Sequence, residues 1–284
     1  MSDRRPSEGP GLHLETPFLN EGLVVAGVDE VGKGSWAGPL VIGIAVLGAS
    51  AASGNLPEGM RDSKALSERT RERVFDGIAE ACAHWATGWA SARECDELGM
   101  SEAQRLACRR AFDALGIAVD VAIVDGRWDF VSPVVHKVVM QVKADRECAS
   151  VAAASVLAKV TRDRHMRELA EHHSHWAFAS NKGYPCAQHR AGLHAWGPSV
   201  EHRTSWAFME NHMPWDGAPR RQRQGDQGSL FCFQPAGCAS RPHCCQLSGV
   251  RERCLMAIER MAIPMKNITM LVSAMVAEAA LRWW

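Results

Sequence analysis

Several apolar, valine-rich runs of this sequence end in, or just before, acidic residues. Runs of this kind predict buried strands. A carboxylate at the end of a buried strand is costly unless it is paired or binds a cation. The run lengths suggest strands of one sheet, so these acidic ends could meet at one edge. The candidate residues are Asp29 with Glu30, then Asp125, then Asp145.

Four carboxylates without cysteine or histidine suit a hard divalent cation such as Mg²⁺ or Mn²⁺ better than Zn²⁺, because hard cations prefer oxygen ligands. Two such ions about 3.5–4 Å apart stabilise both the entering and the leaving oxygen of an in-line displacement at phosphorus. Taken singly, however, each aspartate is more typical of a helix cap or a turn. The cluster therefore indicates metal-assisted phosphoryl chemistry only as a set.

The composition is that of a soluble globular protein: 284 residues, 46% of them hydrophobic and 23% charged. The formal net charge is +0 and the pI about 7.2, so any electrostatic contact with a polyanion must be local. The sequence shows no signal peptide and no apolar stretch of about 18 residues. We therefore expect a cytoplasmic protein without a membrane segment, whose ten cysteines are reduced.

The pattern of apolar and capping residues predicts an alternation of strands and helices. Strands are predicted at about 23–29, 39–48, 84–92, 120–125 and 134–142. Helices are predicted from Ser67 to about Cys82, from a capping box at Ser101 and Gln104 to Gly116, over about 147–172, over 187–196, and over about 201–210 as a last compact helix.

Three regions differ in composition. Residues 1–21 are rich in proline, glycine and charge, and we expect a disordered arm. Residues 22–212 hold the predicted strands and helices and form the expected catalytic domain. Residues 213–284 are a tail rich in cysteine and methionine, with nine basic and five acidic residues, whose structure the sequence does not define.

The block Ala26–Gly34 reads AGVDEVGKG and opens a series of ordered sequence blocks. These blocks resemble the ribonuclease HII family, also called type 2 ribonuclease H, whose opening motif is similar to AGVDEVGKG. The resemblance covers about residues 22–212. Further blocks that resemble the family are Asp62–Ser67, Val124–Gly126, Lys143–Asp163, Lys182–Pro185 with His189, and Gly197–Ser199 with His202–Trp206.

This resemblance implies an α/β protein with a ribonuclease H-like fold: a mixed five-stranded sheet flanked by helices, here with a C-terminal helical cap. It implies hydrolysis of RNA in RNA–DNA hybrids and incision 5′ to single ribonucleotides embedded in duplex DNA. The expected products carry 5′-phosphate and 3′-hydroxyl ends. The implied cofactors are Mg²⁺ or Mn²⁺, two ions per active site. The expected partners are these nucleic acids, with no membrane, and the protein is expected to be a monomer.

The resemblance also implies a role for each matching residue. Asp29, Glu30, Asp125 and Asp145 correspond to the metal-binding catalytic carboxylates. The turn Gly32-Lys33-Gly34 would read the ribose 2′-hydroxyl through backbone groups, since glycines let a backbone come close to a ligand. Tyr184 would stack on the sugar of the next nucleotide. Basic residues expected on the phosphates, each equally well explained as a solvated surface charge, are Lys64, Lys143, Lys182 and Arg203.

Some residues depart from the family pattern. Lys33 stands where the family usually has arginine. Lysine keeps the positive charge but lacks the planar fork with which arginine binds phosphate at two points. Two alternatives are another nuclease of this fold, such as a junction resolvase or a type 3 ribonuclease H, and a nucleic-acid-binding protein without catalysis. The block Gly183-Tyr184-Pro185 argues against the first, and the presence of all four acids argues against the second.

Overall fold

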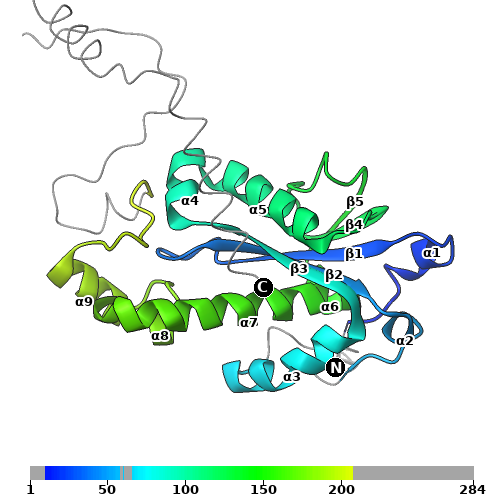
Figure 1. Cartoon of the computed structure of the whole chain (residues 1–284), viewed down its shortest axis with the longest axis horizontal. Coiled ribbons are helices and arrows are strands. Elements are labelled where there is room, and N and C mark those ends of the chain that lie inside the picture. The colour runs from blue at the N-terminus through cyan, green and yellow to red at the C-terminus, as the bar shows by residue number, and fades with distance from the viewer. Residues whose placement is uncertain (1–9, 58–59, 61–65, 207–284) are drawn as a thin grey trace, which may run out of the picture. The chain divides into compact units, whose positions relative to one another are not determined.

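A computed structural model of the chain describes residues 10–57, 60 and 66–206. Its strands form one five-stranded sheet in the order β3-β2-β1-β4-β5 (Figure 1). The three strands β1, β2 and β3 pair antiparallel, whereas β1, β4 and β5 pair parallel. The strands are β1 Val25–Val31, β2 Leu40–Leu47, β3 Cys82–Ala90, β4 Val121–Asp125 and β5 Lys137–Gln141.

Helices cover both faces of this sheet. The long helix α7 packs on β1 and β2 from one side, and α5 packs on β2 and β3 from the other (Figure 1). The mixed five-stranded sheet flanked by helices is therefore confirmed. The helices are α1 Thr16–Leu19, α2 Ala49–Ala52, α3 Glu68–Ala81, α4 Ala92–Leu98, α5 Met100–Leu115, α6 Ala144–Glu147, α7 Ala149–His172, α8 Phe178–Asn181 and α9 Ala187–Trp196, with the 3-10 turn η1 Ser174–Trp176.

Glycines in the strands allow this close packing of helix on sheet. A Cβ atom added at Gly27 would lie 2.1 Å from the carbonyl carbon of Ser150 in α7. One added at Gly88 would lie 2.0 Å from the backbone oxygen of Ala107 in α5. Because a real Cβ never approaches so closely, only glycine lets the helix and strand backbones touch. Helix α7 thereby sits directly on β1, which carries Asp29 and Glu30, and α5 sits directly on the edge strand β3.

Two helix predictions need correction. The helix predicted to end at Gly116 is present as α5, but the capping box predicted at Ser101 and Gln104 is not formed, because the N-cap of α5 is Gly99, two residues before Ser101. A capping box does occur at Ser91 and Glu94, where it starts α4. The predicted helix over 201–210 is absent from its described part, residues 201–206. That segment consists mainly of turns, with one isolated antiparallel bridge between His202 and Ala37.

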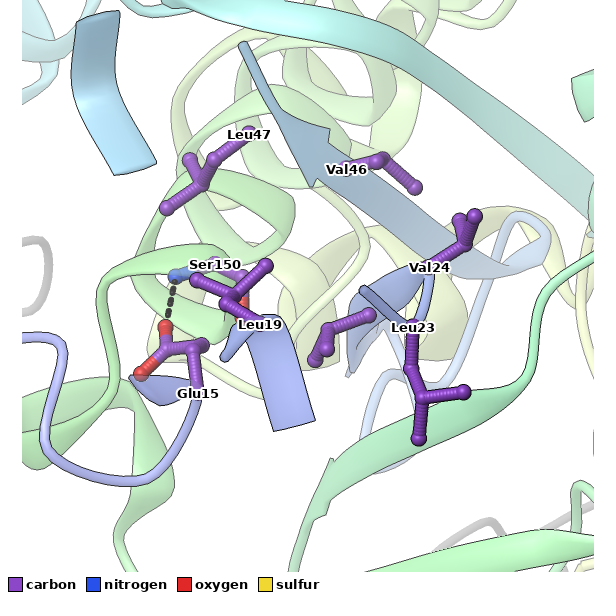
Figure 2. Close-up of a pocket in the computed structure, with 8 residues that line it drawn as sticks. Glu15, Leu19, Leu23, Val24, Val46, Leu47 and Ser150 are labelled. Atoms are coloured by element: carbon purple, nitrogen blue, oxygen red, sulfur yellow. Dashed lines mark hydrogen bonds between the residues drawn. The ribbon is translucent and has the colours of Figure 1, made fainter. Parts of the chain in front are cut away.

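The N-terminal segment is also ordered where disorder was predicted. Residues 10–21 include α1 and a parallel bridge between Gly11 and Cys148. The Glu15 carboxylate, 1% exposed, accepts a hydrogen bond of 2.9 Å from the Ser150 N–H in the first turn of α7 (Figure 2). Leucines and Phe18 between residues 12 and 19 pack on the core, and this apolar burial outweighs the polar composition. Only residues 1–9 of the predicted arm lie outside the described residues.

Figure 2 shows a cavity beside Glu15, which the apolar side chains Leu19, Leu23, Val46 and Leu47 also line.

None of the helices in the described ranges is both long enough and apolar enough to cross a lipid bilayer. The cysteine- and methionine-rich tail predicted over 213–284 lies outside the described residues.

Candidate active site

Two of the predicted acids lie side by side in the sheet, Asp29 within β1 and Asp125 at the end of β4. Val28 of β1 pairs in parallel with Val124 of β4, and each valine is followed at once by an aspartate. Asp29 is 6% exposed and accepts a 2.8 Å hydrogen bond from the N–H of Glu30. The parallel register therefore places Asp29 and Asp125 at the same edge, as the sequence predicted.

The fourth acid joins them from a helix and not from a strand end. Asp125 accepts a 3.0 Å hydrogen bond from the N–H of Ala144, the residue just before Asp145. The chain reverses there through Lys143, whose φ of 64° lies in the left-handed region. Asp145 thus lies in α6, where it is 1% exposed. The backbone link to Asp125 holds the α6 acid at the edge where β4 ends.

Glu30 is held by two side chains in this structure. Its Oε1 forms a 3.0 Å ion pair with Lys33 Nζ, and its Oε2 accepts a 3.1 Å hydrogen bond from Gln104 Nε2. Among the described residues, no three acidic, histidine or cysteine side chains are gathered into a ready-made ion site. The donors fit a hard cation by type, since all are carboxylate oxygens, but Glu30 would have to leave the Lys33 ammonium to join them.

Gln104 is a site residue that the sequence analysis missed. It lies in α5, is 1% exposed, and reaches Glu30 across 74 residues of sequence. The sequence did hold one signal, because a glutamine on the buried face of an amphipathic helix needs a polar partner.

The predicted 2′-hydroxyl turn and the predicted stacking residue are in direct contact. The N–H of Gly32 donates a 3.1 Å hydrogen bond to the phenolic oxygen of Tyr184. The N–H groups of Trp36 and Ala37 donate to the carbonyl of Gly183, at 2.8 and 3.2 Å. The glycine turn and the Tyr184 turn are therefore one structural unit, although about 150 residues separate them.

A cavity of about 260 Å³ connects this unit to Asp29 and Glu30. Lys159 and Arg71 bring positive charge to its wall, and the sequence analysis proposed neither as a substrate contact. Lys159 pairs with Asp163 at 2.7 Å, and burial lowers the pKa of Lys159 although this pair opposes the shift. The lining residues are Asp29, Glu30, Val31, Arg71, Ser155, Val156, Lys159 and Tyr184.

Two buried arginines hold the segment that follows the glycine turn. Arg162 of α7 is 0% exposed and donates to the backbone oxygens of Pro39 and Lys182, at 2.8 and 2.9 Å. Arg203, also 0% exposed, donates to the backbone oxygens of Gly38 and Lys33. Burial lowers the pKa of both guanidiniums, that of Arg203 to about 10.

The burial of Arg203 corrects its predicted role as a phosphate contact. A guanidinium with no exposed surface and its donors on backbone carbonyls positions the turn and cannot meet a phosphate. Lys182 is also corrected, since it is 5% exposed and forms a 3.0 Å ion pair with Glu68. Lys33 and Lys143 are exposed, and their contacts with phosphates stay predictions. Lys64 lies outside the described residues.

Comparison with known proteins agrees with this geometry. The sequence profile of the family described as Ribonuclease HII matches residues 26–209. A ribonuclease HII from Streptomyces avermitilis is 44% identical over 193 residues, which are 68% of this chain and 80% of that protein. One from Thermus thermophilus is 43% identical over 201 residues, which are 71% of this chain and 93% of that protein.

Solved structures are similar as well. The crystal structure of ribonuclease H2 from Pyrococcus horikoshii has a TM-score of 0.53 and 27% identity, covering 66% of this chain and 95% of that one. The ribonuclease HII chain in a complex with PCNA from Archaeoglobus fulgidus has a TM-score of 0.55 and 26% identity, with the same coverage.

Proposed function

The chain belongs to the ribonuclease HII family, and on that premise we propose that it incises duplex DNA 5′ to single embedded ribonucleotides. It is a ribonuclease H, an endonuclease that acts on RNA paired with DNA, and enzymes of this family depend on metal ions. The proposed products carry 5′-phosphate and 3′-hydroxyl ends. We further propose that the enzyme acts as a monomer in the cytoplasm.

One observation carries this proposal: the turn expected to read the ribose and the ring expected to read the next sugar are joined at the acidic edge. Tyr184 lines the same cavity as Asp29 and Glu30, and its hydroxyl holds the N–H of Gly32. A nucleotide bound there would present its own sugar to the turn and the sugar of the next nucleotide to the ring. This supports a cleavage position that depends on whether each of two adjacent sugars is ribose or deoxyribose.

The four carboxylates Asp29, Glu30, Asp125 and Asp145 are proposed to hold two Mg²⁺ or Mn²⁺ ions. Such ions, when bound, lower the pKa of a bound water and stabilise the charge on both reacting oxygens. The protein's own groups prepare the site. The hydrogen bond from Gln104 positions the Glu30 carboxylate, and the Lys33 ammonium pairs with this carboxylate in the absence of cations.

Backbone and charge are proposed to seat the substrate. A Cβ added at Gly34 would meet no atom within 4 Å, so the turn is open on that side, and a sugar could approach its backbone there. The exposed ammonium groups of Lys33 and Lys143 flank the acids and are proposed to meet phosphates, as is Lys64. Each such contact would release counterions and make binding depend on salt.

The test is cleavage of a DNA duplex that carries one ribonucleotide, with Mg²⁺, Mn²⁺ or EDTA. Parallel substrates are an all-DNA duplex and a continuous RNA–DNA hybrid. We expect one metal-dependent cut 5′ to the ribonucleotide, cuts throughout the hybrid, and none in all-DNA.

Asp145→Asn supplies the inactive control, since it removes one ligand charge but no phosphate contact, and it should still bind the hybrid. Cleavage of the hybrid alone would refute incision at single ribonucleotides. Wild-type turnover by Asp145→Asn would refute the assignment of the carboxylates.

A further inference from the structure

Two buried histidines lie behind Tyr184 and have no place in the site described so far. His189, in α9, is 0% exposed, and His202, in the C-terminal segment, is 3% exposed. Their Nε2 atoms are 3.0 Å apart. Two ring nitrogens at this distance share a single proton, because one must donate and the other accept.

The contacts at the outer ends of the pair decide which nitrogen carries that proton. The backbone N–H of Ser199 donates to His202 Nδ1 at 2.9 Å, and the Ser199 hydroxyl lies 2.9 Å from the same atom. A backbone N–H can only donate, so His202 Nδ1 accepts and its proton is on Nε2. That proton points to His189 Nε2, which must accept, so the proton of His189 is on Nδ1.

The far end of this chain of bonds is the tyrosine. His189 Nδ1 lies 2.9 Å from the carbonyl oxygen of Tyr184, an acceptor, so it donates there. That carbonyl belongs to the peptide bond that enters Pro185. At its other end Tyr184 accepts the Gly32 N–H. The backbone and the ring tip of Tyr184 are thus held by separate hydrogen bonds.

We infer that Ser199, His202 and His189 form a one-way hydrogen-bond relay whose function is to position Tyr184 for the discrimination of ribose followed by deoxyribose. His189 and His202 are positioning residues in this account, since neither reaches the cavity. The inference rests on the proposed function in assigning the discrimination, but the direction of the relay does not depend on it.

The surroundings keep both rings neutral, as a relay of this kind requires. Burial lowers the pKa of His189, and burial with the nearby His189 and His173 lowers that of His202 to about 3. The groups packed around the rings are mainly aromatic and carry no opposite charge. They are Trp36, Trp176 and Phe178, and the Cys186 sulfur accepts a hydrogen bond from the backbone N–H of His189.

The direct test is nuclear magnetic resonance of the histidine side chains in the ¹⁵N-labelled full-length protein at neutral pH. The ¹⁵N shifts distinguish the two neutral forms of imidazole. We expect His202 protonated on Nε2 and His189 on Nδ1. Variants His189→Leu and His202→Leu assign the signals, and His194→Leu, on the exposed face of α9, is the control. Any other pair of forms, or a charged ring, would overturn the relay.

The functional test compares kcat/KM on a single embedded ribonucleotide with kcat/KM on a continuous hybrid. His189→Leu should lower this ratio by about three- to tenfold, the effect of one lost positioning hydrogen bond. His189→Asn, whose side-chain amide can replace the Nδ1 donor, should restore most of it. His194→Leu should leave the ratio unchanged.

The outcomes separate the two proposals. A wild-type enzyme that ignores single ribonucleotides refutes the proposed function, while the resonance assignment still decides the relay. A folded His189→Leu with the wild-type ratio, or an Asn variant no better than Leu, refutes the positioning role. If the leucine variants do not fold, His189→Asn and His202→Gln, compared with wild type by resonance and by ratio, decide it. His202→Gln should keep the Nδ1 form of His189, and its absence would count against the relay.

Discussion

The hydroxyl of Tyr184 accepts the backbone N–H of Gly32 at 3.1 Å. The two residues proposed to examine adjacent sugars therefore hold each other in place. Sequence reasoning assigned the role of Tyr184 to its ring alone. The structure gives its hydroxyl a second role, since the oxygen fixes the glycine turn.

The first prediction concerns the two parts of this side chain. Tyr184→Phe removes one hydrogen bond, worth about 0.5–1.5 kcal/mol, and should lower kcat/KM on a single embedded ribonucleotide by about two- to tenfold. Tyr184→Ala also removes stacking worth about 1–3 kcal/mol and should cost about ten- to a hundredfold more. Equal activity of Tyr184→Phe and wild type in steady-state kinetics would show that the hydroxyl has no part in the reaction.

The second prediction separates two glycines of one turn. Gly32 has a φ of +84°, and a Cβ there would lie 2.4 Å from Arg162 Nε, so Gly32→Ala should destabilise the protein by more than about 1 kcal/mol. Gly34 has open space, so Gly34→Ala should change stability by less than about 0.5 kcal/mol yet reduce cleavage at least tenfold. Urea unfolding and kinetics on both variants check this. Full activity of Gly34→Ala would mean that no sugar approaches the turn.

The third prediction concerns competition for Glu30. The Lys33 ammonium lies 3.0 Å from its Oε1, with the side chains 44% and 20% exposed, so the pair is worth at most about 1 kcal/mol. Lys33→Met should therefore tighten Mn²⁺ binding a few-fold, while weakening hybrid binding and lowering its log–log salt slope by about one. Calorimetric titration measures the first effect and fluorescence anisotropy the second. Lys33→Arg is the control that keeps the charge, and weaker metal binding by Lys33→Met would contradict the competition.

The fourth prediction concerns the residue that orients Glu30. Gln104→Leu removes the 3.1 Å donor to Glu30 Oε2 from a fully packed position. Losing such a partner behind a metal ligand typically costs ten- to a hundredfold in metal affinity or activity. Gln188→Leu, on the exposed surface of α9, is the matched control. The assay is cleavage rate against Mg²⁺ concentration, and coincident curves for both variants would exclude a role for Gln104.

The fifth prediction concerns stability and pH. Burial lowers the pKa of His202 from 6.5 to about 3 and also lowers that of His189. Below pH 6.5 the unfolded chain binds protons at these sites and the folded chain does not. The free energy of unfolding should therefore decrease as the pH is lowered. The slope should approach about 1.4 kcal/mol per pH unit for each histidine.

Carboxylates titrate at lower pH than these histidines, so the effects of the two groups on stability can be measured separately. The hydrogen bond from Arg110 lowers the pKa of Glu94 from 4.5 to about 2, and its contribution to stability is lost only as the pH falls below 4.5. Urea unfolding between pH 7.5 and 5 therefore reports the histidines. His202→Gln should remove about half of that slope, and a flat profile in the wild type would contradict neutral buried rings.

The sequence predicted the sheet and the acids because both depend on local patterns. Valine-rich runs mark the strands, and an aspartate after each of two parallel neighbours must reach the same edge once Val28 pairs with Val124. The site of Asp145 was predicted less well. It lies in a short helix, which a reversal at Lys143 creates in place of a strand end.

The supports of the site were missed because their partners are distant in the sequence. Arg162 donates to the carbonyl of Pro39, 123 residues earlier, and no local pattern encodes that contact. A signal did exist, since Ala158, Arg162 and Met166 follow one another at intervals of four and all are buried. A charged residue on the apolar side of a helix predicts a buried hydrogen-bonding role, which Arg162 has.

Gly27 gives the acidic edge one further property. At its contact with Ser150, strand and helix meet through main-chain atoms, with no side chain between them. Side chains can change rotamer or refill a gap when a core is compressed or mutated, but main-chain atoms in contact cannot. The distance between β1 and α7 at this point is thus set by backbone contact and not by side-chain packing. Substitutions or heating can change the packing of the surrounding cores and still leave Asp29, two residues after Gly27, at the same distance from the helix.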